Sequence, residues 1–76
     1  MTKEQLETKM YLESKGWKHT QSWLQETRLM LTMERGGKVI WVDQDAWIKY
    51  LDPDSPGHTL AEPVEMWIDN QKMETI

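Results

Sequence analysis

Residues 28–42 constrain the fold more than any other part of the chain, because they have the pattern of a β-hairpin. Apolar and polar residues alternate before Gly36-Gly37, and a run dense in β-branched residues follows it. A two-residue turn at these glycines predicts an even register with the pairs Leu31–Val42, Thr32–Trp41, Met33–Ile40, Glu34–Val39 and Arg35–Lys38. This register collects the most apolar side chains of both strands on one face, which we expect to pack on the core.

A helix is predicted before this hairpin. Thr2 and Gln5 have the spacing of a capping box, in which each side chain accepts from the other residue's backbone N–H. We expect a helix that begins there and ends just before Gly16, whose lack of a side chain allows the left-handed conformation that commonly ends helices. In that geometry Trp17 should pack on Leu12.

A third strand is predicted between this helix and the hairpin. Residues 17–23 alternate tryptophan, histidine and glutamine with lysine, threonine and serine, which is typical of a rather polar strand. A helix over residues 23–33 is the competing interpretation. The hairpin pattern favours the strand, and we therefore expect three antiparallel strands.

The second half of the chain is predicted to add two helices. Asp43 can cap a helix over residues 44–51, and Pro63 suits the first position of a helix that reaches about Met73. The sequence thus predicts one small α+β domain over residues 1–76: an N-terminal helix, a three-stranded antiparallel sheet and two C-terminal helices, in the order α-β-β-β-α-α. All helices are expected on the apolar face of the hairpin.

Few residues have the arrangement that catalysis or metal binding requires. There is no cysteine, so thiolate ligands, thiol nucleophiles and disulfides are excluded. Residues 52–63 begin like a calcium loop, but proline occupies its fifth and twelfth positions. His19 and His58 have no histidine partner at helical spacing. No nucleophile stands beside a base and no glycine-rich phosphate loop is present, so we expect no enzymatic activity, metal or cofactor.

Charge is distributed unevenly along the chain. Residues 1–40 carry seven Lys/Arg and five Asp/Glu, whereas residues 41–76 carry two and eight, so the two segments have formal charges of +2 and -6. The overall charge of -4 disfavours binding of nucleic acid or an anionic membrane by the whole chain. We find neither a signal-peptide pattern nor an apolar segment of membrane-spanning length, and expect a cytoplasmic protein, in the host cytoplasm if its source is viral.

The sheet face opposite the predicted helices is the candidate contact surface. Its hairpin members are Arg28, Met30, Thr32, Val39 and Trp41. Exposed apolar patches on small monomers commonly have a use, and Trp, Met and Arg are enriched at interface cores. The leading hypothesis is therefore a non-catalytic module that binds another protein. The alternative is that the last helix crosses this face and buries Trp41 under Trp67 or Ile68.

Two other functions fit parts of the sequence. A nucleic-acid binder would stack bases on tryptophan and bind phosphates with basic side chains; the candidates are Trp17, Trp23, Trp41, Lys18, Arg28, Arg35 and Lys38. An acidic mimic of nucleic acid would use the carboxylates of the second half, which are Asp45, Asp52, Asp54, Glu62, Glu65, Asp69 and Glu74. Solvation of helix surfaces is the simpler explanation of those carboxylates.

The general character of the chain narrows the leading hypothesis. A small, cysteine-free, acidic α+β protein resembles the small accessory and inhibitory proteins of bacteriophages, although no motif carries this resemblance. It implies an inhibitor of a host or defence protein. The short chain and the opposite charges of its halves also suggest a homodimer, which would cover the Trp41 face.

Overall fold

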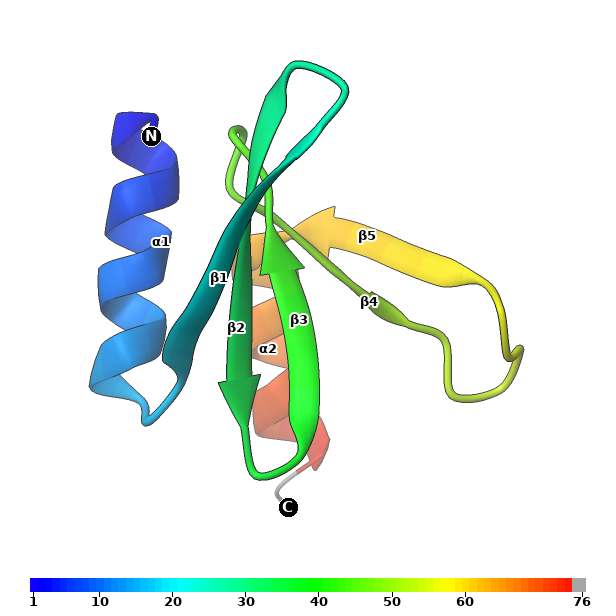
Figure 1. Cartoon of the computed structure of the whole chain (residues 1–76). Coiled ribbons are helices and arrows are strands. Elements are labelled where there is room, and N and C mark those ends of the chain that lie inside the picture. The colour runs from blue at the N-terminus through cyan, green and yellow to red at the C-terminus, as the bar shows by residue number, and fades with distance from the viewer. Residues whose placement is uncertain (75–76) are drawn as a thin grey trace.

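The computed structural model describes the backbone of residues 1–74 and the side chains of residues 1–71. The elements, in chain order, are α1 (Lys3–Ser14), β1 (Lys18–Gln25), β2 (Arg28–Arg35), β3 (Lys38–Val42), β4 (Trp47–Leu51), β5 (Thr59–Pro63) and α2 (Val64–Glu74). The strands form one antiparallel sheet in the order β1-β2-β3-β4-β5. Figure 1 shows α1 beside β1 and α2 behind β2 and β3.

The predicted three-stranded sheet with two C-terminal helices is wrong, because the model has two helices and five strands in the order α-β5-α. The predicted helix over residues 44–51 is instead a tight turn followed by β4. Asp43 does use its carboxylate as a backbone acceptor, but Oδ1 accepts from the N–H groups of Asp45 and Trp47, both at 2.9 Å, and so closes a turn. Ala46 has φ +62°, which a right-handed helix does not allow.

Strand β5 is not predicted by the sequence, which indicates no element over residues 59–62. They pair with β4 from Leu51–Thr59 to Trp47–Pro63. The last helix itself is confirmed: it begins at Val64, one residue after the predicted Pro63. Proline has no backbone N–H to donate, but at the last position of an edge strand this removes no hydrogen bond from the interior of the sheet. Pro63 can therefore end the strand and lead into the helix.

The local predictions for the first half are confirmed. The hairpin has the predicted register, from Leu31–Val42 to Arg35–Lys38. Helix α1 begins with the predicted capping box, in which Thr2 Oγ1 accepts from the Gln5 N–H at 3.1 Å. It ends at Ser14, and Gly16 follows the capping residue Lys15 with φ +93°; the Trp17 N–H donates to the Leu12 carbonyl at 3.0 Å.

Both helices cover the same face of the sheet, which we call the inner face. Leu12 and Trp17 from the α1 region and Trp67 from α2 belong to one buried cluster, which is completed on the sheet by Leu31, Met33, Ile40, Val42 and Ile48. The rings of Trp17 and Trp67 meet edge to face, with centroids 5.7 Å apart and planes at 65°. The two large rings therefore supply much of the core in a short chain.

Strand β1 contains an irregularity that changes which side chains share a face. His19 pairs with Met33 and Gln21 with Thr32, so Thr20 is an extra residue with no partner on β2. Odd-numbered residues of this segment therefore point to one face of the sheet before the β-bulge and to the other face after it. Trp17 consequently lies in the core, whereas Trp23 points to the opposite face of the sheet.

Gln5 connects α1 to the sheet through a buried polar contact. Its side chain is fully buried, and Nε2 donates to the backbone carbonyls of Leu29, at 2.8 Å, and Val42, at 3.2 Å. Gln5→Leu retains the size of the side chain but leaves both carbonyls without this donor, so we expect a loss of about 2 kcal/mol in the free energy of unfolding. Urea denaturation measures it.

The control for this substitution is Glu7→Leu on the exposed side of the same helix. Because surface substitutions usually act weakly, it should change stability by less than about 0.5 kcal/mol. If Gln5→Leu were as stable as the wild type, the two hydrogen bonds would not hold α1 to the sheet.

Candidate functional site

The face of the sheet opposite the helices, which we call the outer face, draws residues from all five strands. A row of directly paired residues crosses it: Gln21, Thr32, Trp41, Lys49 and Ala61. Because paired residues in antiparallel strands point to the same side, these five side chains share the outer face. Trp23 and Met30, which pair with each other, lie beside this row.

The outer face is hollowed at its centre. The hollow has a volume of about 400 Å³ and is lined by Trp23, Gln25, Met30, Trp41, Lys49, Thr59 and Ala61. The ladder between β3 and β4 is short, with the pairs Trp41–Lys49 and Val42–Ile48. Figure 1 shows β4 and β5 running at a steep angle to β2 and β3. This strong twist makes the outer face concave.

Two tryptophans form walls above a buried methionine. Met30 is 1% exposed, whereas Trp23 and Trp41 are half-buried. The indole Nε1 of Trp23 donates to Thr32 Oγ1 at 3.0 Å, so the ring has a hydrogen bond that fixes its orientation. Ring orientation is thus set before any partner arrives, which lowers the entropy lost on binding.

The comparisons with known proteins give no relative on which to build. No family model matches the chain, and no curated protein or solved structure matches it. The function has to be argued from the geometry of the outer face.

The structure separates the five residues predicted for the contact surface. Trp41 lines the hollow, and Val39 is exposed near the β2–β3 turn. Met30 and Thr32 are buried; Met30 lines the hollow, whereas Thr32 does not. Arg28 lies outside the lining residues and pairs with Asp45, Nη2 to Oδ2 at 2.6 Å.

The alternative in which the last helix covers Trp41 is wrong. Trp67 of α2 packs on Trp17 on the inner face. Both described helices therefore leave the outer face uncovered, and Trp41 keeps part of its ring in contact with solvent.

Sequence reasoning missed the part of the hollow that comes from β4 and β5. The sequence predicts a helix around Lys49 and no element at Thr59 or Ala61, so it places none of the three beside Trp41. The signal was present in the alternation of residues 47–51, where Ile48 and Tyr50 face the core. It was too short to distinguish from a helical pattern.

The residues proposed for nucleic-acid binding do not form one surface. The bulge at Thr20 places Trp17 on the inner face, 6% exposed, and leaves Trp23 and Trp41 on the outer face. Arg35 and Lys38 lie with Trp17 near the β2–β3 turn on the helix side. Nucleic-acid binding stays a prediction, now with two of its three tryptophans on a common face.

The acidic residues are dispersed as well. Asp45 pairs with Arg28, Asp52 accepts from the backbone of Asp54 in the β4–β5 connection, and Glu62 accepts from the Tyr50 hydroxyl and the Asn70 amide. Glu65 and Asp69 are exposed on α2, and the Glu74 side chain lies outside the described residues. A row of carboxylates with phosphate-like spacing is not apparent among them.

The histidines and other polar groups make local contacts. His19 Nε2 lies 2.9 Å from Ser22 Oγ, and His58 Nδ1 lies 2.6 Å from Ser55 Oγ. Among the described side chains, no three His, Asp or Glu groups gather at a distance suited to a metal ion. Neither described helix has the length and apolar composition to cross a lipid bilayer.

Proposed function

We propose that this protein is a non-catalytic interaction module that binds another protein through the hollow of the outer face. The observation that supports this most is the pair of half-buried tryptophans, Trp23 and Trp41, around a hollow that the described helices leave open. Aromatic rings in a concave, partly desolvated setting are typical hot spots of protein interfaces.

The lining indicates the chemistry of the partner. An apolar side chain of the partner would lie between the two indole rings and above Met30, with Lys49 at the edge of the same hollow. Among the described side chains, Lys49 has no ion-pair partner. A partner segment with an apolar side chain close to a carboxylate is therefore the best complement.

An inhibitory role is the narrower form of this proposal. A small module without catalytic groups can change the activity of a host or defence protein by occupying one of its functional surfaces. This form is supported by the size and acidic charge of the chain, which resemble those of small bacteriophage inhibitors.

Trp41→Ala tests the proposal after the partner has been captured with the tagged wild-type protein and identified by mass spectrometry. We expect the substitution to weaken binding by about 2 kcal/mol or more, roughly thirtyfold, in isothermal titration calorimetry. Its melting temperature should fall only modestly, because Trp41 is only partly buried. Trp47→Ala is the matched control: Trp47 is 41% exposed and does not line the hollow.

Two results would contradict the proposal. Equal losses of affinity for Trp41→Ala and Trp47→Ala would mean that the hollow is not the contact. Abolished binding in Asp69→Asn would place the activity on α2, which packs on the inner face and contributes no residue to the hollow. Sedimentation equilibrium shows whether a second copy is the partner; Trp41→Ala should then dissociate the dimer.

A further inference from the structure

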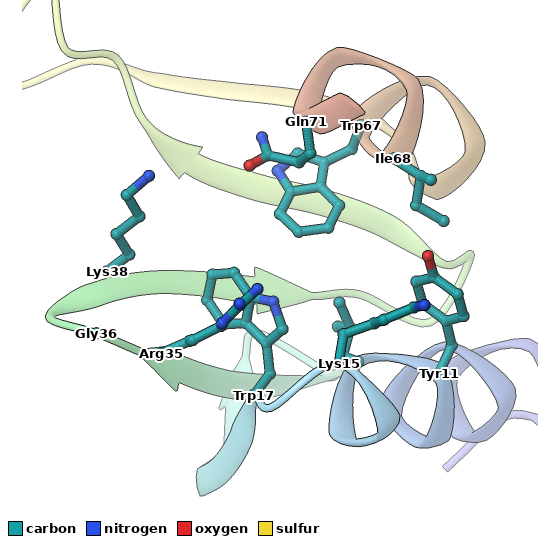
Figure 2. A pocket seen from close by; sticks show the side chains of 10 residues that line it. Tyr11, Lys15, Trp17, Arg35, Gly36, Lys38, Trp67, Ile68 and Gln71 are labelled. Carbon is teal, nitrogen blue, oxygen red and sulfur yellow. The ribbon is translucent and has the colours of Figure 1, made fainter. Parts of the chain in front are cut away.

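A second hollow lies on the helix side of the sheet, between the C-terminal end of α1, the β2–β3 turn and α2. It has a volume of about 570 Å³, within the range of small-molecule sites. Figure 2 shows Trp67 extending from α2 toward Trp17, with Tyr11 projecting from α1. These three rings make much of the wall apolar. We call this hollow the helix-side cleft.

Three cationic side chains surround the helix-side cleft. Lys15 follows α1, and Arg35 and Lys38 flank the β2–β3 turn, where they are directly paired across the hairpin. Like charges at directly opposed positions repel each other. Lys15 Nζ lies 5.7 Å from the centroid of the Tyr11 ring, within cation–π distance, and both residues line the cleft.

These charges are not neutralised by the described part of the chain. The described residues that line the cleft include no aspartate or glutamate. The ion pairs among described side chains are Lys9–Glu13 and Arg28–Asp45, and neither involves the three cations. Three cations around an apolar cleft, in a protein of net charge -4, create a local positive potential that favours binding of an anion.

We propose that the helix-side cleft binds a small amphipathic anion, with a flat apolar body and one carboxylate, sulfonate or phosphate group. The apolar body would lie against the accessible edges of Trp17 and Trp67 and the ring of Tyr11. The anionic group would lie between Arg35 and Lys38, where the guanidinium can donate two parallel hydrogen bonds. This site is separate from the outer face, so either can fail without the other.

The probe for this site is 8-anilinonaphthalene-1-sulfonate, whose fluorescence rises on transfer from water to an apolar site. We expect saturable binding by the folded protein, and at least tenfold weaker binding by the double variant Arg35→Gln/Lys38→Gln. The control is Lys3→Gln/Lys18→Gln, which also removes two positive charges, at exposed positions that line neither hollow, and should change the affinity less than twofold. Both double variants alter residues that are wholly or partly exposed, and near-ultraviolet circular dichroism checks that each is folded.

Two further measurements complete the test. N-phenyl-1-naphthylamine, which lacks the sulfonate, should bind at least tenfold more weakly than the anionic probe. Indole-3-acetate and adenosine monophosphate distinguish a carboxylate from a phosphate as the preferred group, and displacement of the probe by either supports the proposal. Displacement by neither, equal losses in both double variants, or equal affinity for the neutral analogue would overturn it.

Discussion

Trp67→Ala is expected to lower the free energy of unfolding by about 3–5 kcal/mol, the usual cost of removing a buried aromatic ring. Trp67 is 6% exposed and packs edge to face on Trp17. The other apolar residues that α2 packs against the core, Val64 and Ile68, are only partly buried. Most of the attachment of α2 to the sheet therefore depends on this one ring.

Chemical denaturation followed by circular dichroism measures this loss. Met66→Ala is the control, because Met66 is the preceding residue on α2 and is 57% exposed; its loss should stay below about 0.5 kcal/mol. A double-mutant cycle with Trp17→Ala should give a coupling energy of about 0.5–1.5 kcal/mol for the edge-to-face pair. Similar losses for Trp67→Ala and Met66→Ala would show that α2 is not packed on the inner face.

Leu31→Ala is expected to cost about 2–4 kcal/mol, whereas Thr32→Ala should cost about 1 kcal/mol. Leu31 is fully buried at the centre of the inner face. Thr32 is also buried, at 8% exposure, but its loss removes mainly the acceptor for Trp23 Nε1. A domain of this length has a stability of roughly 4–11 kcal/mol, so Leu31→Ala can bring it close to unfolding.

The comparison of positions 31 and 32 tests the hairpin directly. In the observed register Leu31 points toward the core and Thr32 toward the outer face. Midpoints of urea unfolding should therefore differ clearly between the two alanine variants. Equal midpoints would contradict this register and favour a helix through residues 23–33.

The candidate site illustrates where sequence reasoning reached its limit. Trp41 was placed on the open face because its hairpin partner, Thr32, is fixed by the turn at Gly36-Gly37. Lys49 and Ala61 could not be placed there, since their strands were not recognised. The hollow draws its lining from all five strands, and the last two of these strands were not predicted.

The helix-side cleft was missed for a related reason. The sequence predicts Arg35 and Lys38 as a directly opposed pair in the hairpin and predicts that Trp17 packs on Leu12. What joins them to Trp67 is the return of α2 to the inner face, beneath the same turn. This contact spans about fifty residues of sequence, and no local pattern specifies it.

The sequence by itself determined the elements whose interactions are local. The capping box at Thr2, the helix stop at Gly16 and the hairpin register each depend on residues within about fifteen positions of one another, so side-chain chemistry and turn geometry suffice. Only the tertiary structure decided the secondary structure of residues 47–51 and 59–63. A segment of five residues can form either a helical turn or a strand. Residues 47–51 and 59–63 form strands because β4 pairs with β3 and β5 pairs with β4, and these pairings supply the hydrogen bonds that an isolated strand lacks.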